Sequence, residues 1–125
     1  MMISGIGTDI IEIDRIARAV KSEHFIKRVF TTNEINYCKS RGRLAAASYA
    51  VRFAGKEAFF KALGTGIICP LTCVEILNDK LGCPYLNVSD QAAKLISDMK
   101  VSNMKISLSH SRDYAVATCI FETMN

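Results

Sequence analysis

The chain has 125 residues, of which 50% are hydrophobic and 22% charged, with a formal net charge of +4. This length allows one hydrophobic core, so we expect a single domain over residues 1–125. No apolar run approaches the ~20 residues that span a bilayer, and the first residues lack the basic start of a signal peptide. We therefore expect a globular protein of the cytoplasm that does not act on a membrane.

Five cysteines are spread along the chain without a CxxC pair, at Cys38, Cys69, Cys73, Cys83 and Cys119. Only Cys69 and Cys73 are close in sequence, and two sulfurs without a further Cys or His nearby do not make a zinc site. We expect reduced, partly buried thiols, as is usual in a cytoplasmic protein.

The first part of the chain is predicted to form a strand and then short helices. Ile3–Ile10 reads as a strand in which two glycines allow close backbone packing. It runs into a helix whose apolar residues recur at helical spacing: Ile10, Ile13, Ile16, Ala17 and Val20. A short helix follows at Phe25–Phe30, and Thr31 with Glu34 fits a capping box for the next helix.

A long helix is predicted from Leu44 to Leu63, with an alanine-rich start. Gly55 is its weak point, although a glycine there also allows another group to approach closely. The helix stops at Gly64-Thr65-Gly66, where backbone freedom and exposed amides coincide. Its length of about twenty residues, roughly 30 Å, makes it the central element. The side expected to be buried carries Phe53, Phe60 and Leu63.

The second half of the chain contains most of the predicted strands. Thr72–Leu77 and Tyr85–Val88 form a hairpin, and Ser89-Asp90 caps a helix that runs to Met99. Two further strands are expected at Lys105–Ser109 and Tyr114–Phe121. This order predicts the α+β class, with one long central helix packed on a small antiparallel sheet.

Carboxylates and lysines in the first half of the chain form the first candidate site. Asp9 ends the first strand, and Glu57 and Lys61 share one helix face because they are four residues apart. Two carboxylates, with waters and phosphates in the remaining positions, are a usual way of holding Mg²⁺. Lys61, and Lys56 next to Glu57 on a neighbouring helix face, would suit phosphates. The residues alone leave structural alternatives open: Asp9 as a helix cap, and Glu57 with Lys61 as a surface salt bridge.

The turn at Ser109–Ser111 is the second candidate, since hydroxyls, the His110 imidazole and turn amides can bind a phosphate. A Ser/His pair also suggests a hydrolase, but adjacent positions do not bring a nucleophile to its base, and no GxSxG elbow is present. A plain polar hairpin turn is the alternative. His24 borders the basic helix and is expected at the surface.

Basic residues gather in the first half of the chain, which favours an anionic partner: nucleic acid, a phosphate-rich cofactor or an acidic protein. Nucleic acid is the weakest of these, because the chain has no aromatic RNA-binding motif and no Cys/His finger. The residues considered so far leave two functions open. One is a non-catalytic phosphate- or nucleic-acid-binding module, and the other is a metal-dependent phosphohydrolase.

Three stretches form a pattern together: Gly5–Ile10 (GIGTDI), Arg52–Ala62 (RFAGKEAFFKA) followed by Gly64-Thr65-Gly66, and Ile106–Ser111 (ISLSHS). In this order and at this separation they resemble the phosphopantetheinyl transferases. The short chain is similar to the bacterial single-domain type of that family, the holo-[acyl-carrier-protein] synthases. Gly55 stands where the family usually has Ala or a small polar residue.

The resemblance implies transfer of the 4′-phosphopantetheine group from coenzyme A to a serine of apo acyl carrier protein, with release of adenosine 3′,5′-bisphosphate, in support of fatty acid biosynthesis. It implies that Asp9 and Glu57 bind Mg²⁺ together with the coenzyme A pyrophosphate. Lys61 would face the same pyrophosphate, and these three are the expected catalytic residues. The nucleotide and its 3′-phosphate would lie among further residues: Arg52, Gly64, Thr65, Gly66, Pro84, His110 and Ser111.

Single-domain members of the family form trimers with sites between neighbouring subunits. The resemblance therefore implies a homotrimer in which Asp9 and Glu57 come from one chain and the His110 turn from the next. Acyl carrier proteins are small and acidic, so early basic residues of this chain would steer one in. The expected docking residues are Arg15, Arg18, Lys21 and Arg28. The individual contacts differ from the family where Lys21 and His24 replace arginines.

Overall fold

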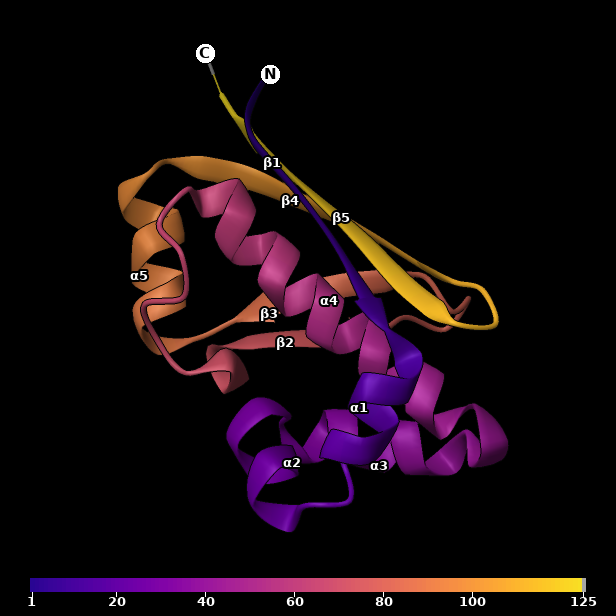
Figure 1. Ribbon diagram of the computed structural model, residues 1–125. Helices are drawn as coiled ribbons and strands as arrows, with labels where there is room; N and C mark the ends of the chain where they lie inside the picture. The colour runs from indigo at the N-terminus through magenta and orange to yellow at the C-terminus, as the bar shows by residue number, and fades with distance from the viewer. Residues whose placement is uncertain (125) are drawn as a thin grey trace.

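The computed structural model describes residues 1–124 as a small sheet with one long helix across it (Figure 1). The sheet has three antiparallel strands in the order β1-β5-β4: β1 is Met2–Glu12, β5 is Tyr114–Thr123 and β4 is Val101–His110. Helix α4, Ala45–Leu63, packs on one face of this sheet, and the two chain ends lie together at one end of it. The predicted α+β architecture is confirmed.

The other elements surround α4 (Figure 1). A second antiparallel pair and a helix follow α4 in the chain: β2 (Val74–Asn78), β3 (Pro84–Val88) and α5 (Asp90–Asp98). Three short helices gather near the start of α4: α1 (Ile13–Ala19), α2 (Glu23–Val29) and α3 (Thr32–Ser40). Single 3₁₀ turns precede α4 and β2, at Gly42–Leu44 and Leu71–Cys73. Within residues 1–124, every helix is too short or too polar to cross a bilayer.

Helix α4 is buried on most of its surface because the sheet, the β2–β3 hairpin and the short helices all cover it. Its aromatic residues anchor it: the Phe59 ring lies 5.2 Å from that of Phe60 and 5.3 Å from that of Phe121 in β5. Small residues of β5 at Ala115, Ala117 and Cys119 allow the helix to sit close to the sheet. This packing fixes which side of α4 is left open to solvent.

Strand β1 approaches α4 closely because Gly5 and Gly7 have no side chain. A Cβ atom on Gly7 would lie 2.0 Å from the Ala58 carbonyl oxygen, and one on Gly5 would lie 2.4 Å from that of Ala62. Contacts this short are not tolerated in a packed interior, so only glycine fits at these two positions. The close approach holds the middle of β1 against the C-terminal half of α4.

Several local predictions are confirmed and two are wrong. The capping box of Thr31 and Glu34 is present, and Gly64 ends α4 with φ 80. Ile10 is not the first apolar residue of the following helix, because β1 continues to Glu12 and leaves Ile10 63% exposed on the outer face of the sheet. Ser89 precedes α5, but its side chain makes no capping hydrogen bond.

Candidate active site

The C-terminal half of β1 and the last two turns of α4 bring three charged side chains together. Lys61 Nζ lies 3.1 Å from Asp9 Oδ1 and also donates to the Thr8 carbonyl at 3.0 Å. Glu57 lies one turn before Lys61 and close enough to Asp9 for the two carboxylates to repel each other. The lysine is thus bound to Asp9 and not to Glu57. The N-cap residue of α1 is Glu12, so Asp9 is free of the capping role considered from the sequence.

Glu57 is in an environment that disfavours its charge. Burial raises the pKa of its carboxyl group and the neighbouring Asp9 raises it further, while Lys61 and Arg15 oppose the shift. Two carboxylates that share one lysine are short of positive charge, and a divalent cation would relieve their repulsion. Carboxylate oxygens are the protein ligands that Mg²⁺ prefers, so this pair fits that metal. Within residues 1–124, no group of three or more His, Cys, Asp and Glu side chains is placed to hold a metal.

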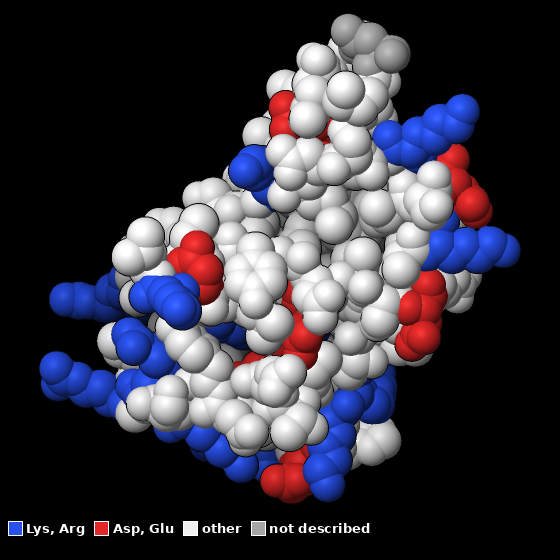
Figure 2. All heavy atoms as spheres, turned by 180° about the vertical axis from the view of Figure 1, so that it is seen from behind, with Lys and Arg blue, Asp and Glu red and all other residues white. Residues whose placement is uncertain are grey.

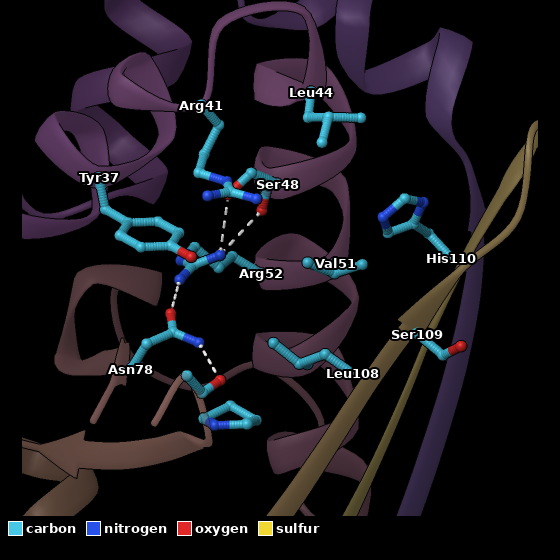
Figure 3. A pocket seen from close by; sticks show the side chains of 12 residues that line it. Tyr37, Arg41, Leu44, Ser48, Val51, Arg52, Asn78, Leu108, Ser109 and His110 are labelled. Atoms are coloured by element: carbon cyan, nitrogen blue, oxygen red, sulfur yellow. Dashed lines mark hydrogen bonds between the residues drawn. The ribbon is translucent and has the colours of Figure 1, made fainter. Parts of the chain in front are cut away.

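A second group of predicted residues lines a cavity of about 180 Å³ between the first half of α4, the end of β4 and the β2–β3 hairpin (Figure 3). Arg52, Pro84 and His110 were predicted to lie together, and all three line this cavity. Ser109, from the candidate turn at Ser109–Ser111, lines it as well. Further lining residues were not singled out from the sequence, among them Tyr37, Arg41, Ser48 and Asn78. Ser48 shares the helical i,i+4 spacing with Arg52, but Tyr37 and Asn78 reach the cavity from separate elements and leave no signal in the sequence.

Arg52 is only 2% exposed and is held by neutral groups. Its Nη1 donates to the Ser48 hydroxyl at 3.0 Å, its Nη2 donates to Asn78 Oδ1, and its guanidinium lies 4.5 Å from the centre of the Tyr37 ring. Among residues 1–124, no carboxylate lies within 4.0 Å of it, and its Nε–H has no partner. A buried cation without a counter-ion is costly, which favours an anionic ligand at this position.

The two groups face opposite sides of α4. Arg52 and Lys61 are separated by about two and a half helical turns, so their side chains leave the helix in opposite directions. Lys61 and Ala58 face β1, as their closeness to Gly7 shows, whereas Gly55 faces Leu108 in β4. Strand β5 separates β1 from β4 in the sheet. Within one chain, the carboxylate–lysine cluster and the Arg52 cavity are therefore separate half-sites.

Comparison with known proteins shows the family of the chain. The model of the 4′-phosphopantetheinyl transferase superfamily matches residues 5–119, which include both groups. The chain belongs to this superfamily. It is 47% identical to a holo-[acyl-carrier-protein] synthase of Ruminiclostridium cellulolyticum over 119 residues, an alignment that covers 92% of this chain and 89% of the relative. As the resemblance of the motifs implied, the chain is an enzyme of the holo-[acyl-carrier-protein] synthase class.

Solved structures of this class share the fold of the transferase. The crystal structure of the synthase from Neisseria meningitidis superimposes with a TM-score of 0.89 at 34% identity, covering 98% of this chain and all of the other (100%). A synthase from Bacillus anthracis, solved in complex with coenzyme A (3′,5′-ADP), gives a TM-score of 0.83 at 37% identity and covers 99% and 100% of the two chains. The α+β fold with a long central helix is therefore that of the known synthases.

The other residues that the resemblance places around the nucleotide do not line the Arg52 cavity. Gly64, Thr65 and Gly66 are exposed at the end of α4, one turn beyond Lys61, and do not line the Arg52 cavity. Ser111 lines a neighbouring groove with His110, Arg43 and Arg112. The grouping of the glycine turn with Arg52 and His110, expected from the resemblance, is thus not found within one chain.

Lys56 of the transferase is not part of either half-site, contrary to the expectation of a second phosphate-binding ammonium group. It is fully buried, and its Nζ donates to Glu34 Oε1 at 2.8 Å and to the carbonyls of Leu71 and Val74 at 3.0 and 2.9 Å. Burial lowers the pKa of Lys56, and Glu34 opposes this shift. The pair joins α3, α4 and β2 and is structural.

The basic residues expected to bind a carrier protein lie at the exposed surface of α1, α2 and the turn between them, at Arg15, Arg18, Lys21 and Arg28. Figure 2 shows Lys and Arg side chains gathered over the lower part of the transferase, where these helices lie. Arg18 is paired with Asp14 on its own helix, which partly occupies its charge. The positive charge of Arg15 also opposes the rise in the pKa of Glu57, so this surface adjoins the carboxylate–lysine cluster.

Proposed function

We propose that the chain transfers the 4′-phosphopantetheine group from coenzyme A to a serine hydroxyl of an acidic apo acyl carrier protein, in a Mg²⁺-dependent reaction. The products are holo-acyl carrier protein, for fatty acid biosynthesis, and adenosine 3′,5′-bisphosphate. The observation that carries this proposal is the cluster of Asp9, Glu57 and Lys61 at the junction of β1 and α4, in which Lys61 pairs with Asp9 and Glu57 lies close to the same carboxylate. We propose that residues 1–125 form one transferase domain and that the enzyme acts in the cytoplasm.

In the proposed reaction, the carrier serine oxygen attacks the β-phosphorus of coenzyme A and forms a new P–O bond. The bond from that phosphorus to the bridging oxygen breaks, and the leaving group departs with its charge on phosphate. Asp9 and Glu57 would hold Mg²⁺, which when bound neutralises charge on the pyrophosphate. Lys61 stabilises the charge that develops on the leaving phosphate. Glu57 accepts the serine proton, directly or through water.

The Arg52 cavity is proposed to receive the nucleotide end of coenzyme A. A buried guanidinium without a carboxylate partner supports a phosphate ligand, here the 3′-phosphate, and His110 and Pro84 line the same cavity. Ser111 lies in the adjoining groove. Thr65 and the two glycines beside it are proposed to offer backbone amides to the other end of the ligand.

The opposite placement of the two half-sites supports a homotrimer with active sites between subunits. In one chain the two half-sites lie on opposite sides of α4, and we propose that one coenzyme A bridges the Asp9 side of one chain and the His110 side of the next. The outer face of the sheet supplies a surface for this association, because Ile6 and Ile10 are 64% and 63% exposed and oppose Ile120 and Val116 of β5. Exposed apolar residues grouped in this way are typical of a protein interface.

The proposal is tested by incubating the protein with an authentic apo acyl carrier protein, coenzyme A and Mg²⁺, and measuring the mass of the carrier. The expected result is a gain of about 340 Da, the mass of the phosphopantetheine group, in a metal-assisted transfer. The gain should disappear when the acceptor serine is replaced by alanine or when EDTA is added. An unmodified carrier with an otherwise folded enzyme would contradict the proposal.

A further inference from the structure

The guanidinium of Arg52 is held from three separate elements, and all of its partners are neutral (Figure 3). Tyr37 comes from α3, Ser48 from the preceding turn of α4, and Asn78 from the last position of β2. Together they fix the plane and the direction of the guanidinium. None of them carries a charge that would cancel the charge of Arg52.

Lys56, the other buried cation of α4, has a charged partner. Lys56, one turn after Arg52, is paired with the carboxylate of Glu34 at 2.8 Å and with two backbone carbonyls, so its charge is fully compensated. Both cations are buried on the same helix, at 0% and 2% exposure for Lys56 and Arg52. The structural cation Lys56 thus has a carboxylate partner, and Arg52 has none among residues 1–124. The difference indicates that the charge of Arg52 is kept for a ligand.

Asn78 differs from the other two partners because both ends of its side-chain amide make hydrogen bonds. Its Oδ1 accepts a hydrogen bond from Arg52 Nη2, and its Nδ2 donates to the Gly82 carbonyl at 2.9 Å. Gly82 and Pro84 line the cavity beside Arg52. One side-chain amide therefore holds the Arg52 guanidinium at a fixed position relative to the hairpin turn. An aspartate would accept the same bond from Arg52 but would also neutralise it.

We propose that Asn78 is a positioning residue for coenzyme A recognition. With Tyr37 and Ser48 it forms a neutral cradle that orients Arg52 toward the 3′-phosphate while leaving its charge available. Asn78 itself does not touch the reacting atoms, so it acts on the binding of the nucleotide end and not on phosphoryl transfer. This inference rests on the proposed function, which places the nucleotide in the Arg52 cavity.

The test compares coenzyme A with 3′-dephospho-coenzyme A as substrates of the Asn78→Ala and Asn78→Asp variants. Asn78→Ala should raise KM for coenzyme A about fivefold, the effect of one lost hydrogen bond, with kcat and the KM for the dephospho form within about twofold of wild type. Asn78→Asp should raise KM for coenzyme A more than Asn78→Ala does, because a carboxylate competes with the phosphate for Arg52.

Asn87→Ala is the matched control, since Asn87 lies in the same hairpin and its amide donates to Glu75 at 3.0 Å, away from Arg52. It should leave the KM for both substrates unchanged. If Asn78→Ala raises the two KM values alike, or Asn78→Asp is no worse than Asn78→Ala, Asn78 is only a hairpin residue and the inference is wrong. Thermal unfolding of each variant shows that a raised KM is measured on folded protein.

Arg52→Ala separates this inference from the function on which it rests. The variant should lose the preference for coenzyme A over the dephospho form. If it keeps that preference, the placement of the nucleotide in the Arg52 cavity is wrong, and the proposed role of Asn78 is wrong as well. If it loses the preference while both Asn78 variants behave like wild type, the nucleotide placement stands and only the role of Asn78 is overturned.

Discussion

Lys61 Nζ lies 3.1 Å from Asp9 Oδ1, and this contact joins the last turn of α4 to the C-terminal half of β1. The Asp9 side chain is 16% exposed and that of Lys61 is 55% exposed, so the pair sits at the surface of the core and remains open to a ligand. Glu57 faces the same carboxylate without a lysine of its own. The two negative charges of Asp9 and Glu57 are opposed by Lys61 and by the nearby Arg15.

Replacement of either carboxylate is expected to stop catalysis and leave the fold intact. Asp9→Ala or Glu57→Ala should lower kcat by at least about 100-fold, because each removes one of the two protein oxygen ligands proposed for Mg²⁺. Excess Mg²⁺ should restore little. The control is Glu23→Ala, which removes an exposed carboxylate paired with Lys27. A near-normal kcat in either site variant, measured with saturating carrier, would remove that residue from the metal site.

The raised pKa of Glu57 predicts a pH-dependent effect on stability. The folded state binds the Glu57 proton more tightly than the unfolded chain does, so this group contributes stability at low pH that is lost as pH rises through its folded pKa. Glu57→Gln should therefore unfold at a higher Tm than wild type at pH 8 without Mg²⁺, and the two should converge toward pH 4. Mg²⁺ should raise the Tm of wild type more than that of Glu57→Gln. A variant that is less stable at pH 8 would contradict this account.

Gly7→Ala is expected to harm both stability and activity. The added Cβ would lie 2.0 Å from the Ala58 carbonyl oxygen, so β1 must move away from α4 and carry Asp9 with it. Overpacking of this kind typically costs about 1–3 kcal/mol in unfolding free energy, which urea titration measures. Ser4→Ala, at an exposed position of the same strand, is the control and should be close to neutral. Equal stability of the two variants would show that β1 can shift freely.

Lys56→Met tests whether the buried pair with Glu34 is structural. The change leaves the Glu34 carboxylate buried without its cation, which typically costs about 3–5 kcal/mol. Lys27→Met breaks an exposed ion pair with Glu23 and should change the unfolding free energy by about 0.5 kcal/mol or less. Urea unfolding of both variants decides the matter: similar midpoints would mean that the buried pair contributes no more than a surface one.

Charge reversal on the basic helices should affect the carrier and not coenzyme A. Lys21→Glu, alone or with Arg15→Glu, is expected to raise KM for the carrier and to weaken the dependence of that KM on salt. The Lys21 variant alone reports on docking more directly, because the charge of Arg15 also affects the pKa of Glu57. The comparison is Lys94→Glu on α5, an exposed site away from these helices. An unchanged KM for the carrier in Lys21→Glu would exclude Lys21 from docking.

The local elements of this protein could be predicted from its sequence because their signals are local. Apolar spacing marked α4, alternation marked the strands, and the Thr31–Glu34 pair and Gly64 marked helix ends that the structure confirms. Asp9, Glu57 and Lys61 were also named from residue type and spacing. The error at Ile10 arose where a strand meets a helix, since one apolar residue satisfies both periods.

Only the tertiary structure decided the partners of these residues. Glu57 and Lys61 look like a pair in the sequence, but the glycines of β1 bring Asp9 against α4, and Asp9 becomes the partner of Lys61. Lys56 and Arg52 look alike as basic residues of one helix, yet folding gives a carboxylate to the first and a neutral cradle to the second. Charge compensation depends on groups far apart in the chain, and no periodicity along the sequence records their distance.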